Sequence, residues 1–128
     1  MSEAFASAVP PGALHVCLLG GFRVSIGKRT LGAEQWRRRK AAHLVKLLAL
    51  SPGHSLHREQ VIDLLWPDLE PGAAVNSLHQ TLHVARGALG AGARARGYLS
   101  LKEDIIHLGA EGTLWIDVDA FQAAAAAA

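Results

Sequence analysis

The stretch from residue 71 to residue 90 carries hydrogen-bonding side chains at spacings that could do chemistry on one helix face. Apolar residues recur there every three or four positions, the period of a helix with one buried face; they are Val75, Leu78, Leu82, Ala85 and Leu89. A rotation of about 100° per residue predicts an opposite face of Asn76, Gln80, His83 and Val84, flanked by Ser77, Thr81, His79 and Arg86. This face contains no acid. Amides, hydroxyls, imidazoles and guanidinium groups bind base edges and phosphates, so the pattern favours a helix that recognises DNA.

Length and charge limit the class of protein. The chain has 128 residues, 50% of them hydrophobic, which predicts a single domain with a sufficient core. Its formal net charge of +2 conceals an uneven distribution. Residues 1–46 hold eight Lys and Arg against two acids, residues 71–102 hold four and no acid, and residues 103–128 hold five acids and no Lys or Arg. This asymmetry predicts a basic surface for an anionic partner and an acidic end turned elsewhere.

The cysteine content and the hydropathy pattern indicate the cellular compartment in which the protein is expected. Cys17 is the single cysteine, so there is no disulfide framework, and its apolar neighbours predict an inert core thiol. No run approaches the roughly eighteen uninterrupted apolar residues of a membrane span. The N-terminus also lacks a positively charged leader. We therefore expect a cytoplasmic protein and no membrane partner.

Residues 1–59 predict a tail, short strands and a basic helix. Residues 1–13 are small and interrupted by proline, which predicts a loose tail. The run 15–19 and the alternating run 22–26, with a Gly pair between them, predict two strands, and 30–31 a third. Arg37, Arg38, Arg39 and Lys40 then open a helix that ends at residues 51–53, with Trp36 folded onto the core. Cations at a helix N-terminus oppose the macrodipole, which favours phosphate binding by this run; a solvated basic turn is the alternative.

The remaining pattern predicts a helix-turn-helix followed by a hairpin. A second helix has an inner face of Val61, Ile62, Leu65 and Trp66, and Pro71 suits the first turn of the next helix. The basic loop of residues 91–97 precedes alternating residues 98–102, a turn at 103–104 and a returning strand at 105–108. Residues 114–116 predict one more strand. Asp117 is then expected to cap a last helix that starts at Val118.

Five segments, taken together and in this order, resemble a known family: LLGGFRVSIG, RRRKAAHLVKLLALSPG, HREQVIDLLWPD, AAVNSLHQTLHVARGALG and LWIDVDAFQAA. The chain resembles the N-terminal DNA-binding region of bacterial transcription activators of the Streptomyces antibiotic regulatory protein (SARP) type. The winged helix of that family is of the OmpR class. The likeness covers about Leu14 to Ala124, and its most specific parts are L-W-P-D and L-x-x-A-R-x-x-L-G.

The resemblance implies an α+β winged helix-turn-helix with an N-terminal antiparallel sheet, three helices and a C-terminal hairpin wing over residues 14–112. Residues 113–128 would begin a helical activation domain that is truncated here. The implied partners are double-stranded DNA, at promoters with direct repeats, and RNA polymerase, through the loop Asp68-Leu69-Glu70. A dimer on DNA is one expected arrangement, with the oligomeric state left open. His57 stands where the family usually has a hydroxyl cap, so we expect the start of the second helix to be less well satisfied.

The residues and the resemblance together predict a DNA-binding surface with the 71–89 helix in the major groove and the 98–108 hairpin on the backbone or minor groove. No cofactor and no metal are expected. The predicted contact residues are Arg37, Arg38, Arg39, Lys40, His57, Arg58, Asn76, Ser77, Gln80, Thr81, His83, Arg86, Arg94, Arg96 and Lys102.

Three other functions are alternatives to DNA binding. His79 and His83 have a metal-ligand spacing, but position 80 is Gln rather than the Glu of zinc proteases, and a third ligand such as Cys17 or His15 would have to approach the exposed helix side. No nucleotide loop, carboxylate pair or catalytic triad is recognisable, which argues against an enzyme. A winged helix used for protein–protein contact, with Val84 central, remains an alternative.

Overall fold

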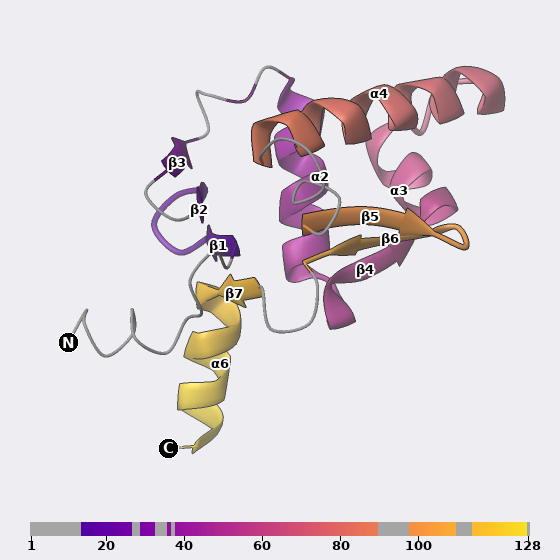
Figure 1. Ribbon diagram of the computed structural model, residues 1–128. Helices are drawn as coiled ribbons and strands as arrows, with labels where there is room; N and C mark the ends of the chain where they lie inside the picture. The colour runs from indigo at the N-terminus through magenta and orange to yellow at the C-terminus, as the bar shows by residue number, and fades with distance from the viewer. Residues whose placement is uncertain are drawn as a thin grey trace.

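The computed structural model describes residues 14–26, 29–32, 36, 38–89, 98–109 and 114–127. Within these residues the fold is α+β, as predicted, with two small sheets and helix α2 (Arg39–Leu50) lying between them in the view of Figure 1. Helix α4 (Pro71–Leu89) runs along one side of the molecule, and helix α6 (Asp117–Ala127) projects from another (Figure 1). No helix in these segments is long and apolar enough to cross a membrane.

The first sheet confirms the predicted N-terminal strands and adds a fourth. Its order is β3 (Arg29–Gly32), β2 (Arg23–Ile26), β1 (Leu14–Cys17) and β7 (Leu114–Ile116). Strands β1, β2 and β3 pair antiparallel, and Leu14, Val16 and Val24 are fully buried on its inner face. Strand β7 pairs parallel with β1, an arrangement that requires a long crossover. The segment predicted to begin a second domain thus starts with a strand of the N-terminal sheet, and the division at residue 112 stays a prediction.

The helices form where the apolar periods predicted them. Helix α2 buries Ala41, Leu44, Val45 and Leu48, and Trp36 just before it packs on the Phe22 ring with centroids 5.8 Å apart. Helix α3 (Arg58–Leu65) buries Val61 and Leu65, whereas Ile62 and Trp66 are only half-buried. The first turn of α4 begins at Pro71, as expected. Between α2 and α3 lie a short 3-10 turn, η2 (Pro52–His54), and a strand, β4 (Ser55–His57).

The second sheet contains the predicted hairpin and one strand that the sequence did not reveal. Strands β5 (Leu99–Lys102) and β6 (Ile105–Leu108) pair antiparallel around Glu103 and Asp104, whose φ angles are 51° and 68°. Two consecutive positive φ values match a tight hairpin turn whose twist fits the flanking strands. Strand β4 pairs antiparallel with β6, so the sheet order is β4-β6-β5. Residues 55–57, for which the sequence pattern predicted no strand, form an edge of this sheet.

The start of α6 differs from the prediction. The helix begins at Asp117 rather than Val118, and the Asp117 carboxylate accepts hydrogen bonds from the backbone N–H groups of Leu18 and Leu19, each at 2.9 Å. Asp119 in the same turn lies 2.8 Å from Nε2 of His54, whose Nδ1 is 3.3 Å from the carbonyl oxygen of Leu48. These contacts attach α6 both to the end of β1 and to the end of α2.

Candidate nucleic-acid interface

The outer face of α4 is built by a helix whose opposite face is packed against the core. Ala74, Leu78, Leu82, Ala85 and Leu89 are buried, and Asn76, His79, Gln80 and His83 are exposed. The face predicted from sequence is therefore present in its central residues. Because α4 joins a short link at Pro71 and packs along α2, these side chains are displayed on a fixed element rather than on a loop.

The helix is turned slightly from its predicted orientation, which corrects two expectations. Thr81, predicted as a DNA contact on the shoulder of this face, is 2% exposed and packs inside the protein. Val84, predicted on the outer face, is half-buried and packs against the core. The physical reason is that Ala74 rather than Val75 lies at the edge of the buried face, so the side of Ala74 and Thr81 is drawn inward. Ser77 is half-buried.

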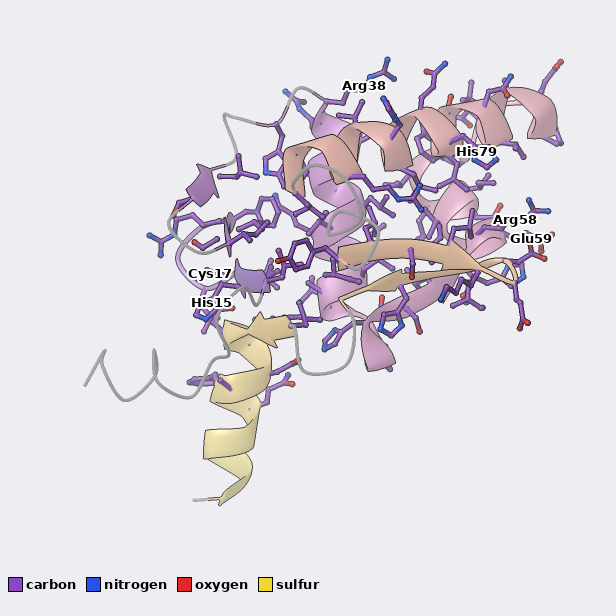
Figure 2. All side chains as sticks on the ribbon, in the orientation of Figure 1. His15, Cys17, Arg38, Arg58, Glu59 and His79 are labelled. Atoms are coloured by element: carbon purple, nitrogen blue, oxygen red, sulfur yellow. The ribbon has the colours of Figure 1, made fainter. Side chains whose placement is uncertain are left out.

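Among the described residues of the basic run, Arg38 reaches this face. Arg38 is the N-cap of α2, with an extended backbone, and its side chain makes no cap hydrogen bond. Its Nη1 instead donates to Oε1 of Gln80 at 3.2 Å. Figure 2 shows Arg38 extending over α4. The guanidinium of Arg38 and the amide of Gln80 on α4 therefore form one exposed group, a contact between residues 42 positions apart that the sequence did not reveal.

The other described cations of that run have different surroundings. Nζ of Lys40 donates to the carbonyl oxygen of Leu65 at 2.6 Å, so its charge lies at the C-terminal end of α3, where the helix dipole favours a cation. A cation is unfavourable at the N-terminus of α2, which suggested that the whole run binds phosphate. For Lys40, the contact with the C-terminal end of α3 offsets this cost. Arg39 is exposed, and Arg37 lies outside the described residues.

The hairpin is fastened to the helices by two other predicted contact residues. Nε of Arg58 lies 3.2 Å from Oδ1 of Asp104, and the Arg58 backbone N–H donates to the Asp104 carbonyl oxygen at 2.8 Å. Figure 2 shows Arg58 at the turn end of the hairpin. Nε of Arg86 donates to the carbonyl oxygen of Leu99 at 2.9 Å. Lys102 is exposed at the end of β5, and Arg94 and Arg96 lie outside the described residues.

His57 corrects the expectation of a poorly satisfied start to α3. Its Nδ1 accepts from the backbone N–H of Glu59 at 3.1 Å, and the Gln60 side chain accepts from the His57 N–H at 3.0 Å. This is a reciprocal capping box with an imidazole in the place of a hydroxyl. The helix start is well satisfied because an imidazole nitrogen can accept a hydrogen bond as a hydroxyl oxygen does.

The link between α3 and α4 is an exposed acidic segment. Asp68, Leu69 and Glu70 are all exposed, with Leu69 44% accessible. The Glu70 carbonyl oxygen accepts from the Ala74 N–H at 2.8 Å, which completes the first turn of α4. The loop predicted to meet RNA polymerase is thus presented beside the N-terminal end of α4.

The geometry that a zinc site would need is not found. Figure 2 shows His15 and Cys17 on the N-terminal sheet, well away from His79 on α4. Among the residues that the structure describes, no three His, Cys, Asp or Glu side chains gather as metal ligands would. Cys17 is half-buried; burial raises the pKa of its thiol, and the Asp117 carboxylate raises this pKa further while Arg23 acts in the opposite direction. A raised thiol pKa suits the expected inert cysteine.

Comparison with known proteins identifies a similar fold in a solved structure. No family model matches the chain, and no curated protein matches its sequence. A solved structure of Mycobacterium tuberculosis EmbR in complex with a low-affinity phosphopeptide is similar to it, with a TM-score of 0.62 and 22% sequence identity. The match covers 79% of this chain and 26% of the EmbR chain, so this chain corresponds to about a quarter of that protein. At this identity, the likeness shows a shared fold alone.

Proposed function

We propose that this chain is the DNA-binding part of a bacterial transcription regulator of the SARP type, with an OmpR-class winged helix. Helix α4 would enter the major groove, and the β5–β6 hairpin would act as the wing against the backbone or minor groove. The observation that carries the proposal is the exposed, acid-free face of Asn76, Gln80 and His83, joined at its centre by the Arg38 guanidinium. The fold shared with the EmbR structure agrees with this proposal at the level of the fold alone.

The predicted DNA-contact residues fall into groups according to the partner that each side chain already has within the protein. Asn76, Ser77, Gln80 and His83 would face the bases or the sugar–phosphate edge. Phosphates would be met by Arg38, Arg39 and Lys102, which are exposed, and by Arg37, Arg94 and Arg96, which lie outside the described residues. Thr81 is left out because it is buried, and Lys40, His57, Arg58 and Arg86 act within the protein as caps and ties.

Two partners follow from the family resemblance. Binding at promoters with direct repeats would place two copies of the chain on one face of the DNA, and the exposed Asp68-Leu69-Glu70 loop would contact RNA polymerase. The loop directly precedes α4 in the sequence and carries two acids. Repulsion between these acids and the DNA phosphates would keep the loop off the duplex.

Binding of a labelled duplex pool, followed by fluorescence anisotropy across a salt series, tests the function. With about five phosphate contacts, affinity should fall by about several hundred-fold between about 50 and 200 mM salt. Lys102→Ala and Arg39→Ala should each lower the salt slope by about one. Arg23→Ala, on β2 of the other sheet, is the matched control and should leave the slope unchanged. A flat salt response of the unmodified chain would contradict DNA binding and favour a protein–protein module.

A further inference from the structure

The contact between Arg38 and Gln80 constrains which way the Gln80 amide faces. A guanidinium carries only donors, so the atom that Gln80 presents to it must be its carbonyl oxygen. The Gln80 Oε1 lies 3.2 Å from Arg38 Nη1, and its Nε2 therefore lies on the other side of the amide. An amide that would otherwise rotate freely on an exposed helix face thus has one favoured orientation.

That orientation matters because adenine recognition uses both ends of the amide. A Gln side chain pairs bidentately when its oxygen accepts from adenine N6 and its nitrogen donates to N7. The Gln80 oxygen has two acceptor positions, of which Arg38 occupies one and leaves one for the base. The nitrogen keeps both of its donors. The side chain is consequently arranged for adenine before any DNA arrives.

The placement of Arg38 follows from its position in the fold. Arg38 is the N-cap of α2. The helix dipole does not stabilise its charge there, because the N-terminus of a helix disfavours a cation. Helices α2 and α4 pack together, which brings the cap of one beside the middle of the other. The side chain is exposed, so its remaining N–H groups stay available to a phosphate.

We propose that Arg38 is a specificity-determining positioning residue: it orients the Gln80 amide for adenine, in addition to contributing positive charge to binding. The inference rests on the proposed DNA-binding function. It predicts that the effects of Arg38 and Gln80 on base preference are not independent, because each acts through the same amide.

The test uses a duplex library with a randomised centre, bound by the unmodified chain and by Arg38→Ala, Lys102→Ala, Gln80→Ala and the Arg38→Ala/Gln80→Ala double variant. Lys102→Ala is the matched control because it removes the same charge from an exposed position on the hairpin. Both single-charge variants should weaken binding to the unselected library and lower the salt slope by about one. Arg38→Ala alone should also reduce, by about threefold to tenfold, the adenine preference at the position that Gln80→Ala abolishes. The double variant should discriminate no less than Gln80→Ala.

A second measurement follows the amide in the free protein. The side-chain NH₂ resonances of Gln80 in an NMR spectrum should shift in Arg38→Ala and stay in place in Lys102→Ala. If the unmodified chain binds no library duplex in a salt-dependent way, the proposed function and this inference fall together. If it binds, but Arg38→Ala and Lys102→Ala show the same base preferences, the inference alone is overturned.

Discussion

Arg58 holds the turn residue Asp104 with two groups at once, its side-chain Nε at 3.2 Å from Oδ1 and its backbone N–H at 2.8 Å from the carbonyl oxygen. The start of α3 and the tip of the hairpin are therefore fixed to each other, although 46 positions separate the two residues in the chain (104 minus 58). The ion pair also neutralises a cation that the sequence had suggested for DNA.

Neutralising Asp104 should therefore strengthen DNA binding. Asp104→Asn keeps a residue that tolerates the positive φ of 68°, but it removes an acid near the duplex and releases the Arg58 charge. We expect tighter binding and a salt slope steeper by about one in the anisotropy titration. Glu103→Gln removes the same charge from the same turn without releasing Arg58, so it should strengthen binding less. Equal effects of the two variants would mean that Arg58 does not reach DNA.

Exchanging the Gln80 amide for a carboxylate should change the preferred base. Gln80→Glu can only accept hydrogen bonds, and the side chain would form an ion pair with Arg38. Because Glu accepts from cytosine N4, the preference at that position should move from adenine to cytosine. Sequencing of bound duplexes from the randomised library measures this shift. An unchanged adenine preference would show that another residue reads the position.

The imidazole cap of α3 makes a measurable contribution to stability. His57→Ala removes the acceptor of the Glu59 N–H, so the free energy of unfolding should fall by about 1 kcal/mol. His57→Asn supplies another good capping oxygen and should stay within about 0.5 kcal/mol of the unmodified chain. Urea unfolding followed by circular dichroism compares the two. A loss as large in His57→Asn as in His57→Ala would show that the imidazole contributes by packing rather than by capping.

The surroundings of Cys17 should appear in its alkylation rate. Burial and the Asp117 carboxylate raise the thiol pKa, so the thiolate, which is the nucleophile, forms only at higher pH than in an ordinary cysteine. The pH profile of iodoacetamide labelling, followed by mass spectrometry, should be displaced upward. Asp117→Asn should move it down, and Arg23→Gln should move it further up, because Arg23 acts in the opposite direction. Cys17 is the single cysteine, so the signal comes from one group.

The predictions from sequence succeeded where a pattern is local. The three-four spacing of Leu78, Leu82, Ala85 and Leu89 fixes one buried face of α4. Alternation over 98–102, followed by a turn and a returning apolar run at 105–108, predicts the hairpin. The exact edge of the α4 face was not predictable, because packing buries Thr81 more and Val75 less than the apolar pattern alone indicates. Strand β4 is three residues long, too short to show a period.

The contacts that the sequence analysis did not predict in the candidate DNA-binding surface join residues far apart in the sequence. Arg38 meets Gln80 across 42 positions and Lys40 meets Leu65 across 25, so no local pattern could indicate that one cation of the run binds a side chain of α4 while another binds the end of α3. The sequence identified the surface by its lack of acids and its polar groups. It could not divide its cations between those bound within the protein and those free.

The parallel pairing of β7 with β1 has a consequence for how the chain is made and how it can be cut. Ribosomal synthesis releases Leu14–Cys17 about a hundred residues before Leu114–Ile116, so one side of β1 has no strand beside it until residues 114–116 have emerged. A fragment ended at residue 112, where the domain boundary was predicted from sequence, would carry that open side permanently. Unpaired strand edges recruit other chains, so such a fragment is expected to aggregate, whereas one that retains residues 114–127 keeps the edge covered.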